Sequence, residues 1–140
     1  SAADCPSGII DIPSSLNKKS GVTKICKDLA DKLTQLKNSV SGLNLIITST
    51  IDGDHESSCH KANNAKSGNC ADIALRDSSG NPVVHTDPSW GKLCSAVVSI
   101  KGLDFLNEAT NQGTCNNTRK FQTYAKTTAP HLHIMRTSDK

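Results

Sequence analysis

The sequence predicts an α+β fold in which a mostly antiparallel sheet packs against two main helices and disulfides staple the chain. Three observations lead to this prediction: helical and strand-like patterns follow one another irregularly, only 3% of residues are aromatic, and six cysteines are scattered through 140 residues. A core with so little aromatic bulk is thin for this length, so cross-links are expected to support it. The length suits one domain, which we expect over residues 21–140 after an irregular lead-in over residues 1–20.

Two segments have helical character. Apolar side chains recur at three- and four-residue intervals from residue 22 to residue 40, with Ser20 as the N-cap and Gly42 as the stop signal. A second helix is expected to begin at Asp87-Pro88, because aspartate caps helices and proline suits the first turn, and to end at Gly102. Both patterns predict helices with one buried face.

Six short segments have the composition of strands. Residues 43–51 form a run rich in isoleucine and threonine. Residues 71–75 and 82–85 flank a turn-forming Asp-Ser-Ser-Gly-Asn segment and therefore predict a hairpin with a longer loop. The remaining strands are expected near residues 103–106, 121–125 and 131–135.

The cysteines indicate an exported protein. Their even number and dispersion predict three disulfides rather than a zinc ribbon, which needs paired knuckles. Several pairings are compatible with the sequence. Disulfides persist in oxidising compartments, so we expect a secreted protein, extracellular or periplasmic. The six positions are Cys5, Cys26, Cys59, Cys70, Cys94 and Cys115.

Charge and hydropathy limit the classes of partner. The net charge is only +3, and the lysines of the first third alternate with acidic and polar residues, which is typical of a solvated helix face. We therefore expect no nucleic-acid partner. The sequence contains no apolar run of the ~18–20 residues that a membrane span requires. We expect the protein to be a monomer without a membrane span.

The histidines form two groups that suggest a metal site. His131 and His133 flank one residue, and on a strand such side chains point to the same face. One imidazole can then bind a metal while the other donates a proton or stabilises a transition state. The same spacing is equally typical of hydrogen-bonded histidines that bind no metal. His85 stands apart, and we expect it to be an exposed residue at a strand end.

The second group lies around residues 54–72. It contains His55 and His60, and Asp72 opens an apolar strand. A carboxylate so close to a core is costly unless a cation compensates it. Two imidazoles and one carboxylate with a fourth position open form the ligand set of a catalytic zinc, since the open position holds the water that the metal activates.

Two segments carry a resemblance to a known family. Residues 68–73 (GNCADI) and 130–134 (PHLHI) resemble motifs of the hedgehog and D-Ala-D-Ala carboxypeptidase type of zinc peptidase, in the family's order, within a similarity that spans about residues 22–136. The resemblance implies the hedgehog/DD-peptidase fold. It also implies that Gly68 is a turn residue with positive φ or a close backbone approach.

The resemblance further implies the residues of a site. The implied ligands of Zn²⁺ are His60, Asp72 and His133, while His131 lies beside the water and assists the tetrahedral intermediate. Glu108 is the expected general base, with a solvated strand-end carboxylate as the alternative. The implied activity is that of a zinc metallopeptidase, of carboxypeptidase or endopeptidase type, which cleaves D-amino-acid-containing peptidoglycan peptides by metal-activated water.

Two of the sequence's departures from the family's pattern bear on the site and its substrate. The spacing from His60 to Asp72 is longer, so His55 is a rival first ligand, and a Cys59–Cys70 disulfide would tie off the expanded loop. Residues 48–50 (TST) offer no arginine of the kind that grips a substrate carboxylate in the cell-wall carboxypeptidases. The second hypothesis is therefore a catalytically inactive hedgehog-like zinc-binding module that recognises a cell-wall or protein partner.

Overall fold

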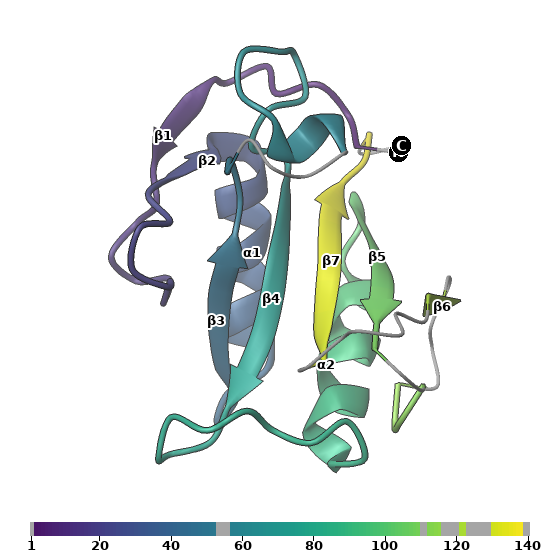
Figure 1. Cartoon of the computed structure of the whole chain (residues 1–140). Coiled ribbons are helices and arrows are strands. Elements are labelled where there is room, and N and C mark those ends of the chain that lie inside the picture. The colour runs from purple at the N-terminus through teal and green to yellow at the C-terminus, as the bar shows by residue number, and fades with distance from the viewer. Residues whose placement is uncertain (1, 53–56, 110–111, 116–120, 123–129, 139–140) are drawn as a thin grey trace.

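The main sheet is the centre of the molecule (Figure 1). The computed structural model describes residues 2–52, 57–109, 112–115, 121–122 and 130–138. The five strands lie in the order β3-β4-β7-β5-β6, antiparallel except for the parallel pair β5 and β6. Their bounds are β3 Asn44–Ser49, β4 Cys70–Arg76, β5 Leu103–Glu108, β6 Phe121–Gln122 and β7 His131–Arg136.

Two helices pack on one face of this sheet (Figure 1), α1 over Lys27–Ser39 and α2 over Pro88–Ser99. Trp90 of α2, Leu29 of α1 and the sheet residues Ile73, Phe105 and Ile134 are nearly inaccessible to solvent and belong to one apolar cluster. Burial of these side chains is the main force that holds the layers together. The predicted α+β fold with a mostly antiparallel sheet, two main helices and disulfides is therefore confirmed.

The second helix begins as predicted. The Asp87 carboxylate accepts a hydrogen bond from the backbone N–H of Ser89 at 2.9 Å, and Pro88 occupies the first turn. This cap satisfies one of the N–H groups that every helix start leaves without a backbone partner.

The first helix begins five residues later than its apolar pattern predicts. Lys24–Cys26 is strand β2, which pairs with β1 at Ile9–Asp11 inside the lead-in, and the backbone of Cys26 is extended. Cys26 is also bonded to Cys5. The pairing with β1 overrides the helical pattern of residues 22–26, so the expectation of a helix from residue 22 and of a wholly irregular lead-in is corrected.

The predicted hairpin is reduced to one bridge. Residue 76 pairs with Pro82, but residues 82–85 form no strand. Both edges of β4 are already occupied, by β3 on one side and β7 on the other. The strand near residue 121 is present as β6, and residues 123–125 of that prediction lie outside the described residues.

Three disulfides cross-link the chain: Cys5–Cys26, Cys59–Cys70 and Cys94–Cys115. The second is the pair expected to tie off the expanded loop. No helix in the described part of the chain is long and apolar enough to cross a bilayer.

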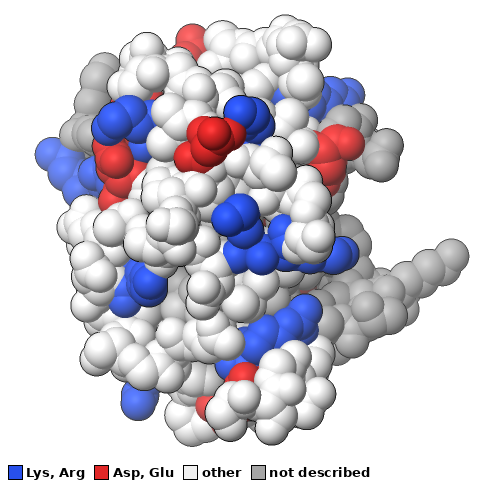
Figure 2. All heavy atoms as spheres, turned by 90° about the vertical axis from the view of Figure 1, so that its left-hand side faces the viewer, with Lys and Arg blue, Asp and Glu red and all other residues white. Residues whose placement is uncertain are grey.

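The face that carries β1, β2 and the edge of β3 has a mixed charge (Figure 2). Basic side chains are spread over it, and acidic ones lie beside them, mainly in its upper part. Among the described ion pairs, Lys24 of β2 contacts Asp11 of β1, and Lys27 lies 2.8 Å from Asp31 along α1. Such exposed pairs contribute little to stability.

Candidate metal centre

The candidate site lies on the sheet face opposite the helices. Ile73 and Leu132 belong to the helix-side core, so their strand neighbours Asp72 and His133 point the other way. Asp72 and His133 are direct partners in the register of β4 and β7. Strand pairing therefore brings together two side chains that are 61 residues apart in sequence.

His60 reaches the same place from outside the sheet. It ends the short helix η1, Ser58–His60, and its side chain is completely buried. Its Nδ1 lies 2.5 Å from the carbonyl oxygen of Thr50, which can only accept, so Nδ1 carries a proton and donates. In the neutral ring, the lone pair of Nε2 then faces the other two residues, as in histidine ligands whose second nitrogen bonds a carbonyl.

Gly68 holds the loop that carries His60 close to the rest of the fold. Its φ is +74°, and an added Cβ would lie 2.8 Å from the backbone nitrogen of Cys26. Its N–H donates to the carbonyl of Cys59 at 2.8 Å. The expected turn role of Gly68 is present in both of its forms, positive φ and close approach.

The three donor atoms form a nearly equilateral triangle. Its edges are 3.5 Å from His60 Nε2 to Asp72 Oδ1, 3.2 Å from His133 Nδ1 to Asp72 Oδ1, and 3.3 Å from His60 Nε2 to His133 Nδ1. Two nitrogen or oxygen ligands at about 2.0–2.1 Å from a tetrahedral zinc lie about 3.3–3.4 Å apart. The three side chains thus have the spacing of ligands around one tetrahedral metal ion.

Asp72 and His60 alter each other's protonation. Burial alone would raise the pKa of the Asp72 carboxyl, but hydrogen bonds from His133 and His60 hold that pKa well below its usual range. Burial opposes charge on His60 too, yet the Asp72 carboxylate raises the pKa of its imidazole above the ordinary value. The carboxylate is therefore ionised and ready to bind a cation, while a proton competes for His60.

A second pair borders the triangle. His131 Nε2 lies 2.6 Å from Glu108 Oε2, because the two residues are direct partners in the register of β5 and β7. Donor atoms of this pair and of Asp72 lie within 4.8 Å of one another. Glu108 is mostly buried, with 11% of its side chain exposed, and is not the solvated carboxylate of the alternative hypothesis, whereas His131 is 27% exposed.

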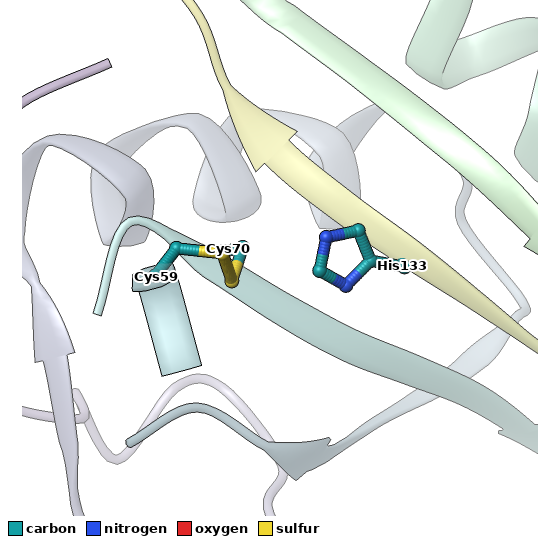
Figure 3. A group of neighbouring side chains, drawn as sticks. All are labelled: Cys59, Cys70 and His133. Atoms are coloured by element: carbon teal, nitrogen blue, oxygen red, sulfur yellow. A yellow bond between two sulfur atoms is a disulfide. The ribbon is translucent and has the colours of Figure 1, made fainter. Parts of the chain in front are cut away.

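A disulfide lies close to His133, one of the three residues of the triangle (Figure 3). Cys59 of η1 and Cys70 at the start of β4 are bonded, and their sulfurs lie within 4.8 Å of an imidazole nitrogen of His133. The disulfide therefore links the loop of His60 to the strand of Asp72.

The sequence analysis missed the residues that hold His60. Ser49 Oγ donates to the Asp52 carboxylate and lies 3.3 Å from His60 Nδ1, beside the Thr50 carbonyl. A backbone carbonyl leaves no signal in the sequence, although the hydroxyl-rich end of β3 was visible. The rival ligand His55 lies outside the described residues.

His85 corrects an expectation. The residue is buried, with 8% of its surface exposed, whereas an exposed histidine was expected. Its Nε2 lies 3.0 Å from Asn107 Oδ1, and its ring contacts Trp90 edge-on. Asn107 lies on the strand β5 next to Glu108, so its side chain points to the opposite sheet face. His85 is part of the helix-side packing and not of the candidate centre.

No family model, curated protein or solved structure matches this chain.

Proposed function

We propose that the chain is a zinc-dependent peptidase of the hedgehog and D-Ala-D-Ala carboxypeptidase type, acting on peptidoglycan peptides that contain D-amino acids. The observation that carries the proposal is the triangle of His60, Asp72 and His133, whose edges of 3.2 to 3.5 Å suit one tetrahedral zinc. Two imidazoles and one carboxylate leave a coordination position open, which distinguishes a catalytic from a structural zinc site.

His60, Asp72 and His133 would hold the metal. A bound zinc ion would supply Lewis acidity, polarising the scissile carbonyl and acidifying water. The Thr50 carbonyl keeps the proton of His60 on Nδ1, away from the metal side. The single negative charge of Asp72 lowers the cost of placing a cation in this buried position.

Glu108 and His131 would handle protons. Glu108 accepts the proton of the attacking water and passes it to the leaving amine, as a general base and then a general acid. His131 hydrogen-bonds the Glu108 carboxylate at 2.6 Å and so fixes its orientation. As an imidazolium, His131 also offsets the negative charge of the tetrahedral intermediate.

The test is zymography of the purified protein on cell-wall peptidoglycan, with and without a chelator. The proposal expects chelator-sensitive digestion that added Zn²⁺ restores. A Glu108→Gln protein should bind zinc normally yet lose at least about 100-fold in rate, since general acid–base catalysis contributes about that much or more. Asp104→Asn, on the same strand, is the matched control with unchanged activity. Digestion that no chelator affects, or that Glu108→Gln retains, would contradict the proposal.

A binding module is the second candidate. It is favoured by the end of β3, where Thr48, Ser49 and Thr50 provide no arginine for a substrate carboxylate. This candidate predicts zinc-dependent co-sedimentation with intact cell wall, no digestion, and no effect of Glu108→Gln on binding.

A further inference from the structure

We propose that Cys59, Cys70 and His133 form a second, reduction-dependent metal site, which shares His133 with the His60–Asp72–His133 triangle and exchanges with it. The inference rests on the metal centre proposed above but not on peptidase activity. Its basis is a juxtaposition: the two sulfurs and an imidazole nitrogen of His133 lie within 4.8 Å of one another (Figure 3).

The backbone already suits thiolate ligands. The Cα atoms of Cys59 and Cys70 are 5.6 Å apart. Two thiolates bound to a tetrahedral zinc at about 2.3 Å lie about 3.8 Å apart, a separation that side-chain rotation at this Cα spacing allows. Cys70 lies two residues before Asp72 on β4, so both point to the same sheet face as His133. A metal that moves between the two sites stays on that face.

The surroundings favour a soft ion over a free pair of thiols. Cys59 and Cys70 are buried in a small apolar cluster with Ala2 and Met135, and Leu106 packs against it. Thiolates buried in this cluster need a cation. Sulfur and imidazole donors suit Zn²⁺, Cd²⁺ and Cu⁺, whereas the oxygen of Asp72 makes the first site harder.

The exchange needs a reductant, which we identify by class as a dithiol. One thiolate of the dithiol attacks a sulfur of the pair, the Cys59–Cys70 bond breaks, and the dithiol becomes a cyclic disulfide, having supplied two electrons and two protons. The new thiols release those protons to solvent when they bind the metal as thiolates. Ser57 and Ser58 beside the disulfide are exposed, so a local opening of η1 brings a reductant to it.

The consequence is a change of ligands rather than a simple loss of the metal. While the disulfide is intact, it holds His60 against Asp72 and His133. Once it opens, His60 is released and two thiolates compete for the ion. The oxidised state is thus an N/O site with an open position, and the reduced state is a thiolate site.

The experiment follows Co²⁺, whose thiolate complexes absorb by charge transfer in the near ultraviolet, in the full chain before and after reduction by a water-soluble phosphine. The phosphine supplies no thiolate of its own, because it becomes a phosphine oxide with oxygen from water. The oxidised chain should bind one Co²⁺ without the charge-transfer band. The reduced chain should release titratable thiols and gain the band.

Variants assign the band. It should disappear in a Cys59→Ser/Cys70→Ser protein and persist in the matched control Cys5→Ser/Cys26→Ser, which removes another cysteine pair near a carboxylate, Asp28. His60→Ala should abolish binding by the oxidised chain and leave the band of the reduced chain. His133→Ala should weaken both.

Three outcomes would overturn the inference: a folded chain that releases no thiols, a reduced chain without the band, or a band that survives Cys59→Ser/Cys70→Ser. The two proposals fail separately. An oxidised chain that binds Co²⁺ and digests cell wall, but shows no band when reduced, defeats only this inference. A chain that binds Co²⁺ only when reduced defeats the proposed function and the exchange between the two sites, and leaves only the thiolate site standing.

Discussion

The candidate metal triangle of His60, Asp72 and His133 draws its side chains from two regions that are built differently. Asp72 and His133 lie on adjacent central strands, and their proximity follows from strand register. His60 lies in a loop, and its position depends on the Cys59–Cys70 disulfide, the turn at Gly68 and the Thr50 carbonyl. The difference teaches that strand pairing alone preorganises two ligands, while the third depends on cross-links and local hydrogen bonds.

The most severe test of this comparison removes a strand ligand. Asp72→Asn keeps the shape of the side chain but removes the charge that compensates a cation. Zinc affinity should therefore fall by more than about 100-fold, which exceeds the usual effect of changing a residue that only orients a metal ligand. Isothermal titration with Zn²⁺ measures this. The helices and sheet should remain intact by circular dichroism, and retention of near-normal affinity would show that the metal does not bind at this triangle.

The next test leaves the site and weakens the opposite sheet face. Ile134 is fully buried beside His133 in sequence but faces the helices. Ile134→Ala should lower the free energy of unfolding by about 2–5 kcal/mol, the usual cost of truncating a buried isoleucine. Denaturant titration measures the loss, with zinc affinity of the folded protein changed less than tenfold. A large loss of affinity without loss of stability would show that the two faces are not independent.

A smaller effect is expected from the support of the loop ligand. Ser49→Ala removes the hydroxyl that links the Asp52 carboxylate to His60. Zinc affinity should fall about 10-fold, at the lower end of the range for residues that orient a ligand. Ser39→Ala, which removes a hydroxyl bonded to the Leu36 carbonyl at the end of α1, is the control with an unchanged zinc titration. Equal affinities of the Ser49→Ala protein and the native chain would show that the Ser49 hydroxyl does not orient His60 for binding.

The protonation of Asp72 and His60 should make both stability and zinc affinity depend on pH. The fold lowers the pKa of Asp72 from 3.8, so this contribution to stability is present above pH 3.8 and is lost as the pH falls through the folded value. It raises the pKa of His60 from 6.5, so that contribution is full below pH 6.5 and is lost as the pH rises through the folded value.

Asp72 and His60 should therefore stabilise the metal-free protein most between about pH 4 and 6.5. Denaturant titration in the presence of a chelator measures this free energy of unfolding. Zinc affinity should instead decrease as the pH falls through this interval. It should fall about tenfold per pH unit below the raised pKa of His60, because one proton must leave for each ion bound. A Zn²⁺ affinity that is constant over this interval would exclude His60 as a ligand.

The same contrast explains how far the sequence could predict the structure. Alternation along β7 placed His131 and His133 on one face, whereas the grouping of Asp72 with His133 followed from the family resemblance. The Asp87-Pro88 start of α2 was correctly located by local rules. The predicted start of α1 was wrong because the pairing of β2 with β1 is a contact between segments distant in sequence, which local patterns do not reveal. His85 was misjudged because its partners, Trp90 and Asn107, belong to other elements.

The last described strand of the chain, β7, lies between β4 and β5 in the sheet. The pairs β4–β7 and β5–β7 at the centre of the sheet therefore cannot form until residues 131–136 have been added, and both His131 and His133 arrive with these residues. Such late, non-local pairing slows folding. A chain that crosses a membrane during export would therefore be unable to assemble the triangle until residues 131–136 have been translocated.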